Sequence, residues 1–572
     1  MLEKINKHSR SILKYFTIAS YILSIIIYEI FICNGERTGI YNFSIYRIVM
    51  YTIFLIVTFK YIDRFIIQAI NTMQSKFKKI SLSIYIPIAI MLIIYIMIRW
   101  TSVYKIAILL IALLMGLIFI IYVSADYIKN TILIICTFGI ICTVATDFHH
   151  TLDEKRHIFS AINISEGNID YKNNPLNETN FYEIKMNCDI DEFAKQYSKR
   201  YEPELTDNWE DDDSETPLIS SLPADYNFII YLPSAIGITV AKVLGGSVAD
   251  TYISARLFNL ITYAIMISFA LKILPYKHKI FYIIFTFPIS IVLAATCSVD
   301  GLCIGLIGMF IAYCLKLSEE NYENIKVKQI MTLIILFAGC LLAKDLSYCA
   351  MILLVLILPI SKILKNNKKK LPLIITIIVI SIIIAGILML SKFTSTTAGG
   401  GDPRGGTTSV SGQIGFLINS PFNAIKVGFT HIMNSLLNYN WGTYLNNSCF
   451  FGKYSAQIFF LQLIFIIYVS CTDNSHKMKT RTTIVSILTF LAVFASTSLM
   501  LYLTFTPVGQ IEIAGYQPRY ILPILPLVLM LINNNRYIGK TSIEEEKNTD
   551  ISIALMSGLF VMIDIICLIY VI

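Results

Sequence analysis

One polar segment interrupts an otherwise apolar chain and gathers the residues best suited to chemistry. It runs from about residue 147 to residue 227, and it opens on TDFHHTLDEKRH at positions 146–157. If residues 152–167 form a helix, Asp153 and His157 share one face, with Glu154 beside them. Carboxylates here could take a proton from a hydroxyl group or bind a divalent cation through oxygen. The alternative is a pair of acids stabilised by the dipole of a helix N-terminus.

Four further charged residues lie at the predicted ends of apolar segments. Each has a simple structural explanation: an arginine can extend to lipid headgroups, an aspartate can cap a helix, and a lysine can pair locally. Their shared position is more informative, because it brings charges from distant parts of the chain to one boundary. Such an arrangement suits a site where a lipid-linked phosphate meets a carboxylate. These residues are Arg256, Lys344 and Arg519, which we expect at the phosphate, and the acidic residue Asp300.

The composition predicts an all-α polytopic membrane protein that positions these residues with membrane spans. Hydrophobic residues make up 56% of the 572 and charged residues only 15%, whereas soluble domains are about one quarter charged. The chain contains about fifteen blocks of roughly the 20 apolar residues that one span needs. They are, approximately, 12–33, 44–60, 81–98, 103–123, 131–146, 252–274, 280–297, 301–317, 328–343, 347–362, 371–391, 455–471, 481–505, 519–534 and 551–571.

The distribution of lysine and arginine predicts the orientation in the plasma membrane. Basic clusters lie at residues 4–10, 60–79, 277–279, 362–370 and 477–481. The positive-inside rule assigns such ends to the cytoplasm, and a cytoplasmic N-terminus places every cluster there. This threading requires that residues 228–247, which contain a proline and three glycines, form an interfacial or re-entrant helix. The loops 147–227 and 392–454 then lie outside, and the net charge of +8 needs no nucleic-acid partner.

Three zones follow from this pattern. Residues 1–130 are expected to form a four-span N-terminal extension, and residues 131–535 a catalytic membrane core that carries the notable polar residues. Residues 536–572 are expected to form a cytoplasmic linker and a last span. The twelve cysteines include no CxxC pair, so no zinc site is predicted, although a disulfide between Cys188 and Cys449 in the two outer loops stays open.

The motifs around the charged residues resemble those of the bacterial membrane proteins in domain-of-unknown-function family 2142. The resemblance covers roughly residues 131–535 and leaves out the first four predicted spans. One departure is Thr151-Leu152, which stands where family members usually have a proline before the acidic pair. The motifs are LDEKRH (152–157), ISEG (164–167), YLPSAIG (231–237), ARLFN (255–259), FP (287–288), SVD (298–300), AK (343–344) and PRYILP (518–523).

That family in turn looks like a branch of the GT-C superfamily of polytopic glycosyltransferases. The resemblance implies a GT-C-like helical bundle whose long first outer loop carries interfacial helices and the catalytic acid. It implies Asp153 as catalytic base and Asp300 as the match to the second acidic position. The donor would be a polyprenyl-phosphate-linked sugar, and the acceptor a hydroxyl of a glycan or cell-wall polymer on the outer face. The enzyme would then be a hexosyltransferase, with a divalent cation as the one candidate cofactor.

Two other functions fit a protein of this kind. An outer-leaflet polysaccharide polymerase would also have large outer loops. A transporter or flippase of lipid-linked glycans would also place charges among many spans, but nearer the bilayer midplane and often in repeated halves. The Gly-rich stretch GGGDPRGG at 399–406 lacks the GxxxxGK[ST] pattern of a nucleotide-binding loop and is interpreted as a flexible outer loop.

Overall fold

The computed structural model describes most of the chain as helices of different lengths. It describes residues 2–33, 44–72, 76–99, 103–145, 154–171, 226–246, 248–320, 325–358, 408–435, 456–473, 478–532 and 543–571. Within these ranges there is no strand. Polypeptide in a bilayer must satisfy its backbone hydrogen bonds internally, and helices do so within one segment. The predicted all-α class is therefore confirmed for the part of the chain that the structure describes.

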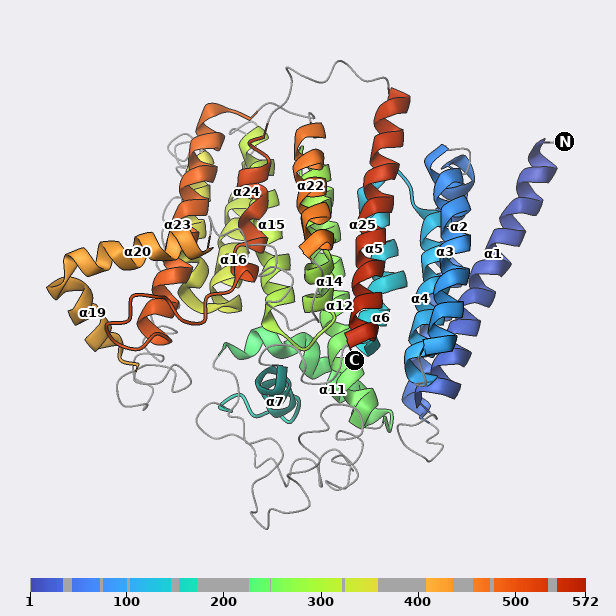
Figure 1. The fold of residues 1–572 in the computed structure, drawn as a ribbon, viewed down its shortest axis with the longest axis horizontal. Coiled ribbons are helices and arrows are strands. Elements are labelled where there is room, and N and C mark those ends of the chain that lie inside the picture. The colour runs from blue at the N-terminus through green and yellow to red at the C-terminus, as the bar shows by residue number, and fades with distance from the viewer. Residues whose placement is uncertain are drawn as a thin grey trace, which may run out of the picture.

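Eight helical segments among the described residues are long and apolar enough to cross a membrane. They stand side by side in one row, with the N-terminal helices at one edge (Figure 1). They belong to α1 (Leu2–Ile27) with its π-helical continuation η1 (Tyr28–Cys33), α2 (Ile45–Thr72), α4 (Val103–Tyr122), the unit α5 (Tyr127–Ile134), η2 (Ile135–Gly139) and α6 (Ile140–Ala145), α12 (Val248–Ile273), α15 (Val299–Glu319), α23 (Thr480–Thr504) and α25 (Ile543–Val571).

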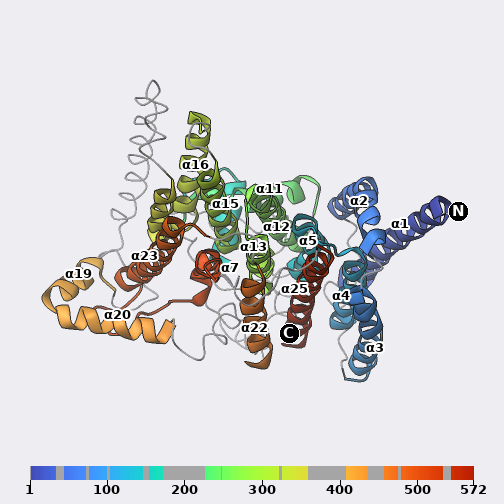
Figure 2. The ribbon, with the colours of Figure 1, turned by 90° about the horizontal axis from the view of Figure 1, so that it is seen from above.

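Four further helices lie among and beside these spans. Helix α3 (Lys76–Arg99), with Pro87 inside it, has 24 residues. The others have 13 to 17 residues and are α16 (Val327–Ala343), the 3₁₀ helix η6 (Asp345–Ile357) and α22 (Ala456–Thr472). Seen from above, α16 and α22 lie on either side of the row of spans (Figure 2). The predicted span at 371–391 falls outside the described residues.

Two predicted spans are broken into pieces by proline. The block 280–297 forms α13 (His278–Phe285) and α14 (Pro288–Ala294), separated at Phe287. The block 519–534 forms two 3₁₀ turns, η9 (Pro518–Tyr520) and η10 (Leu522–Ile524), and the five-residue helix α24 (Leu525–Leu529). Proline lacks the amide hydrogen that a helix interior needs, and it restricts the residue before it to extended backbone. The expectation of one continuous span in each block is therefore corrected.

The two helices α7 (Glu154–Ser165) and α11 (Leu232–Val243) do not cross the bundle but lie over one end of it (Figure 1). Twelve residues extend only about 18 Å as a helix, which is well short of the roughly 30 Å hydrocarbon core. The prediction of a non-crossing helix within 228–247 agrees with this placement. We call this side of the molecule the α7 end.

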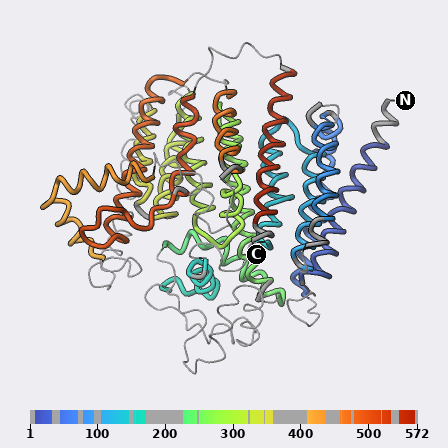
Figure 3. Tube along the Cα trace, viewed as in Figure 1, coloured from blue at the N-terminus to red at the C-terminus, as the bar shows by residue number. Residues whose placement is uncertain are grey.

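We call the opposite side the basic end, because Lys479 and Lys279, from two of the predicted basic clusters, lie there. Lys479 lies 2.9 Å from Glu319, at the last residue of α15, and Lys279 lies 3.1 Å from Asp550. Since α15 has 21 residues, it separates Glu319 from Asp300, near its other end, by about 30 Å. Figure 3 shows that α1 starts at this basic end and that α25 starts there too and runs toward the α7 end.

A glycine brings α11 into backbone contact with α12. A Cβ atom on Gly237 would lie 2.5 Å from the backbone oxygen of Ser254. The Ser254 hydroxyl also donates a 2.7 Å hydrogen bond to the Gly237 carbonyl. The close approach fixes α11 across the first turns of α12.

Replacing Gly237 with alanine is therefore expected to lower the free energy of unfolding by about 1–3 kcal/mol, because two backbones must separate. Gly428→Ala is the matched control, since a Cβ at this helical position meets nothing within 4 Å. That change should raise stability by up to about 1 kcal/mol. Thermal unfolding of both variants in one detergent measures the difference, and equal midpoints would contradict the close packing.

Candidate functional site

The clearest charged cluster of the α7 end centres on Asp300 in the first turn of α15. Ser298 caps this helix, and its hydroxyl accepts a 3.1 Å hydrogen bond from the Asp300 amide. The Lys344 ammonium group, just after α16, donates to Asp300 Oδ1. On the other side of the carboxylate, Arg519 Nε of η9 lies 3.1 Å from Oδ2. One carboxylate thus sits between two cations, and the trio carries a net charge of +1.

The ring of Tyr520 lies against both cations of this cluster. The Lys344 ammonium lies 4.2 Å from the centroid of the Tyr520 ring, and the Arg519 guanidinium lies 5.7 Å from the same ring. The Tyr348 hydroxyl donates a 2.9 Å hydrogen bond to the Tyr520 carbonyl, which ties η6 to η9. Charge contacts in such a buried, low-dielectric setting are stronger than at a solvated surface. Neither tyrosine was a predicted site residue, although Tyr520 is part of the PRYILP motif.

A second ion pair, between Glu154 and Arg256, lies wholly inside the protein. Arg256 Nε and Nη2 donate to the two Glu154 oxygens at 2.9 and 2.7 Å, and neither side chain is exposed to solvent. Arg256 Nη1 also donates to the Thr143 carbonyl at 3.0 Å. This fork of parallel hydrogen bonds is the strongest arrangement of an arginine with a carboxylate. It ties together α6, α7 and α12.

Residues of α7 and α12 also hold the turn before Asp300. Glu154 Oε1 accepts a 2.9 Å hydrogen bond from the Cys297 amide. The Asn259 side-chain amide donates to the carbonyls of Thr296 and Ser298, at 3.0 and 3.3 Å. Asn259 was not predicted as a site residue, but its position in ARLFN, three residues after Arg256, places it on the same face of α12. Glu154, Arg256 and Asn259 thus position Asp300 rather than face an open site.

His157 links α7 to the Asp300 cluster. Its Nδ1 atom shares a 2.8 Å hydrogen bond with the Tyr231 hydroxyl, and its ring lies 5.7 Å from that of Tyr226. Burial, followed by the nearby Tyr171 and Tyr226, raises the pKa of Tyr231 well above its ordinary value, so this phenol stays protonated. The His157 ring is also close enough to Asp300 to interact with its charge. Residues from α7, η4 (Phe228–Tyr231), α15, η6 and η9 therefore meet at one place.

Comparison with protein families decides where this chain belongs. The family model described as predicted membrane protein (DUF2142) matches residues 136–528. The chain belongs to the DUF2142 family. Comparison with curated proteins and with solved structures gave no match. The membership confirms the family resemblance that the motifs predicted, and the matched range contains every charged residue of the two clusters described above.

The DUF2142 core is joined to the helices before it by a further buried ion pair. Arg47 of α2 donates to both oxygens of Asp250 in the first turn of α12, at 3.2 and 3.1 Å. Its Nε donates to Glu29 of η1 at 2.8 Å. Asp250 stands six residues before Arg256 on the same helix. The N-terminal helices are thus anchored to the helix that holds the Glu154 pair.

The structure places all but one of the predicted site residues. His157, Asp300, Lys344 and Arg519 come together, while Glu154 and Arg256 pair with each other behind them. Asp153 lies outside the described residues, immediately before the first residue of α7. Across the described ranges, His, Cys, Asp and Glu side chains form no group of three or more that could hold a metal ion. The acidic run at 202–215, Cys188 and Cys449 also lie outside the described residues.

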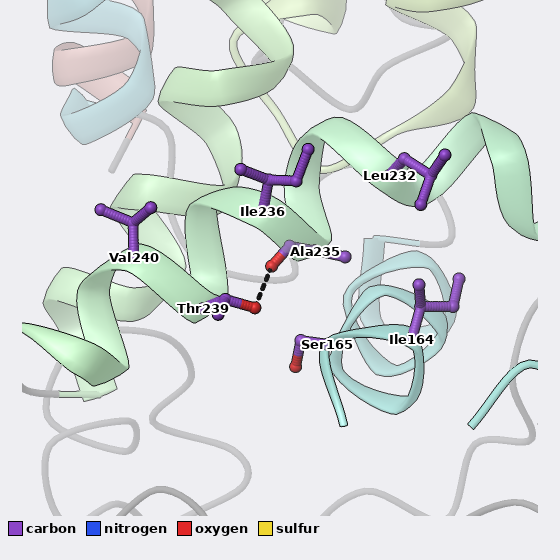
Figure 4. Close-up of a pocket in the computed structure, with 7 residues that line it drawn as sticks. All are labelled: Ile164, Ser165, Leu232, Ala235, Ile236, Thr239 and Val240. Carbon is purple, nitrogen blue, oxygen red and sulfur yellow. Dashed lines mark hydrogen bonds between the residues drawn. The ribbon is translucent and has the colours of Figure 1, made fainter. Parts of the chain in front are cut away.

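A shallow hollow of about 230 Å³ lies between α7 and α11 (Figure 4). It has none of the charged residues of the two clusters in its lining, and most of its lining side chains are apolar. The Lys242–Glu166 ion pair joins α11 to α7 beside this hollow. The hollow is lined by Ile164, Ser165, Leu232, Ala235, Ile236, Thr239 and Val240.

Proposed function

We propose that this protein is a membrane glycosyltransferase that moves a sugar from a polyprenyl-phosphate donor to a hydroxyl group. The observation that carries the proposal is the Asp300 carboxylate shared by Lys344 and Arg519. Two cations and one anion leave a net positive charge in a buried setting at the end of a membrane bundle. A phosphate at the headgroup level of a lipid is the ligand that such a charge would attract.

The distribution of charge supports an active site on the outer face of the plasma membrane. Lys479 and Lys279, from two of the predicted basic clusters, lie at the end opposite to α7, and basic clusters face the cytoplasm under the positive-inside rule. Asp300 and its partners lie about one span length away, at the α7 end. A donor carried by the outer leaflet would thus meet an acceptor that arrives from the outer aqueous side, such as a cell-surface glycan or cell-wall polymer.

The proposal gives a role to five of these residues. The acceptor oxygen attacks the anomeric carbon, and the bond from that carbon to the phosphate oxygen breaks with its electron pair leaving on the polyprenyl phosphate. Asp153, next to the start of α7, takes the acceptor proton. Lys344 and Arg519 stabilise the charge that develops on the leaving phosphate. Glu154 and Arg256, already bound to each other, hold the turn that carries Asp300.

The proposal is tested by reconstituting the purified protein in vesicles that contain a panel of polyprenyl-phosphate sugars. Transfer of labelled sugar to a soluble glycan acceptor is expected above the level of protein-free vesicles, with polyprenyl phosphate as the second product. The same sugars on polyprenyl diphosphate serve as the comparison. Folded protein that transfers from none of the donors would overturn the proposal.

A further inference from the structure

A helical hairpin projects from the bundle beside α23 and exposes a large apolar face. It consists of α19 (Val410–Asn419) and α20 (Pro421–Ser435), joined at Ser420. Figures 1 and 2 agree that the hairpin extends sideways from the row of spans at the edge farthest from α1. The two helices extend about 15 and 22 Å, so neither is long enough to cross the roughly 30 Å hydrocarbon core. The sequence placed this segment in a polar outer loop.

The exposed face of α20 is built from residues at helical spacing. Phe422, Ile425 and Phe429 are 79%, 71% and 64% exposed, and Ile418 at the end of α19 is 72% exposed. Spacings of three and four residues put the three side chains of α20 on one stripe. Exposed apolar side chains of this size in a contiguous stripe mark contact with another molecule or with lipid.

The opposite face of α20 is held against the bundle by a polar contact. His431 Nε2 shares a 2.7 Å hydrogen bond with the Ser498 hydroxyl of α23, and its ring stacks on Phe494 with centroids 5.2 Å apart. Burial lowers the pKa of His431 to about 4, so the ring is neutral near pH 7 and suits an apolar surrounding. The same ring meets Tyr516 edge-on at 4.5 Å. The bundle therefore holds α20 through the face opposite to the apolar stripe.

Two contacts set the depth of the hairpin. Ser498 lies six residues before the end of α23 at Thr504, which is about 9 Å along the helix axis. At the start of the hairpin, Gln413 accepts a 3.0 Å hydrogen bond from the amide of Gly509, beyond the end of α23. Both contacts therefore lie in the half of the bundle nearer the α7 end.

The spanning helix beside the hairpin also exposes apolar side chains. Helix α23 exposes Ile484, Leu488, Leu491 and Leu499 to between 48% and 53%, as expected for side chains that face acyl chains. Lys426 also lies on the exposed face of α20, four residues after Phe422. Its four-carbon stem can carry the ammonium group to the headgroups, which suits a shallow position in one leaflet.

We infer that α19 and α20 form a membrane-embedded hairpin that enters the α7-side leaflet without crossing it. The acyl chains of that leaflet cover the exposed face, because α20 binds α23 at Ser498 and both helices expose large apolar side chains at that depth, Leu499 on α23 among them. The inference does not depend on the proposed activity. It does give the lipid a direct contact with an element that touches Tyr516, three residues before Arg519.

Tryptophan fluorescence in vesicles tests the hairpin. The native Trp100, Trp209 and Trp441 are replaced with phenylalanine, and single tryptophans are introduced as Ile425→Trp or Phe429→Trp. Ile464→Trp, in the middle of α22 and 62% exposed, is the lipid-facing control, and Glu546→Trp at the basic end is the water-facing control. Thermal unfolding of each variant checks that the fold is kept.

Brominated phosphatidylcholine is expected to quench both hairpin tryptophans about as strongly as that of Ile464→Trp, while acrylamide quenches only that of Glu546→Trp. Bromines near the headgroup should quench the hairpin tryptophans more than bromines near the chain ends. Access of acrylamide without lipid quenching would place the hairpin in water and overturn the inference. Quenching by neither agent would mean that a protein surface covers the face, and it would overturn the inference as well.

Discussion

Replacing Arg519 with glutamine is expected to slow sugar transfer by about 10²–10³-fold in kcat, with the fold unchanged. Losing one preorganised positive group at a developing charge typically costs this much. The change also turns the net charge of the Asp300 trio from +1 to zero, so the leaving phosphate loses its attraction to the site. Asp153→Asn, which removes the proposed base, should lower kcat by about 10²–10⁴-fold.

Initial rates in proteoliposomes measure both effects, with thermal unfolding as the check on folding. Arg519→Lys should retain part of the rate, because it keeps the charge but loses the planar guanidinium. Lys479→Gln is the control, since this 55% exposed lysine pairs with Glu319 at the basic end. Equal rates for Arg519→Gln and Lys479→Gln would remove Arg519 from the donor site.

Charge and hydropathy predicted much of the fold because the length of an apolar segment and the charges at its ends can both be read directly from the sequence. The apolar blocks at 252–274, 301–317 and 481–505 correspond to α12, α15 and α23, since a bilayer requires long apolar helices. Hydropathy alone could not separate a span from several short helices, and the breaks at Pro288, Pro523 and Pro526 were therefore missed. The hairpin of α19 and α20 was missed for a related reason: its helices of 10 and 15 residues, separated at Ser420, are each too short to form an apolar block of span length.

The charged residues that lie together around Asp300 could be chosen from the sequence, but their pairing could not. Charged residues at the ends of apolar segments pointed to Asp300, Lys344 and Arg519, because isolated charges are costly inside a membrane. The residue types alone do not determine which cation pairs with which acid. Arg256 was expected at a phosphate and instead pairs with Glu154, a contact between residues 102 positions apart that depends on how α7 lies over α12. Asn259 was missed because an amide on an apolar helix carries no charge signal.

That buried pair makes Glu154→Gln the largest stability change that we expect. The substitution leaves the Arg256 guanidinium without its counter-ion in a place where neither side chain is exposed. Breaking a buried pair on one side costs about 3–5 kcal/mol, much of it from the uncompensated charge. The Cys297 amide also exchanges a carboxylate for a weaker acceptor, so the turn before Asp300 should loosen.

Equilibrium unfolding in mild detergent, followed by circular dichroism, measures this loss. Asp63→Asn is the control, because the Asp63 side chain is 62% exposed in its pair with Lys14, and exposed pairs contribute about 0–1 kcal/mol. The double variant Glu154→Gln with Arg256→Met should recover part of the stability, since it removes the buried charge. Recovery stays incomplete because the Thr143 carbonyl loses its donor. A loss for Glu154→Gln no larger than that for Asp63→Asn would mean that the Arg256 charge is compensated by another group, and the positioning role of the pair would have to be given up.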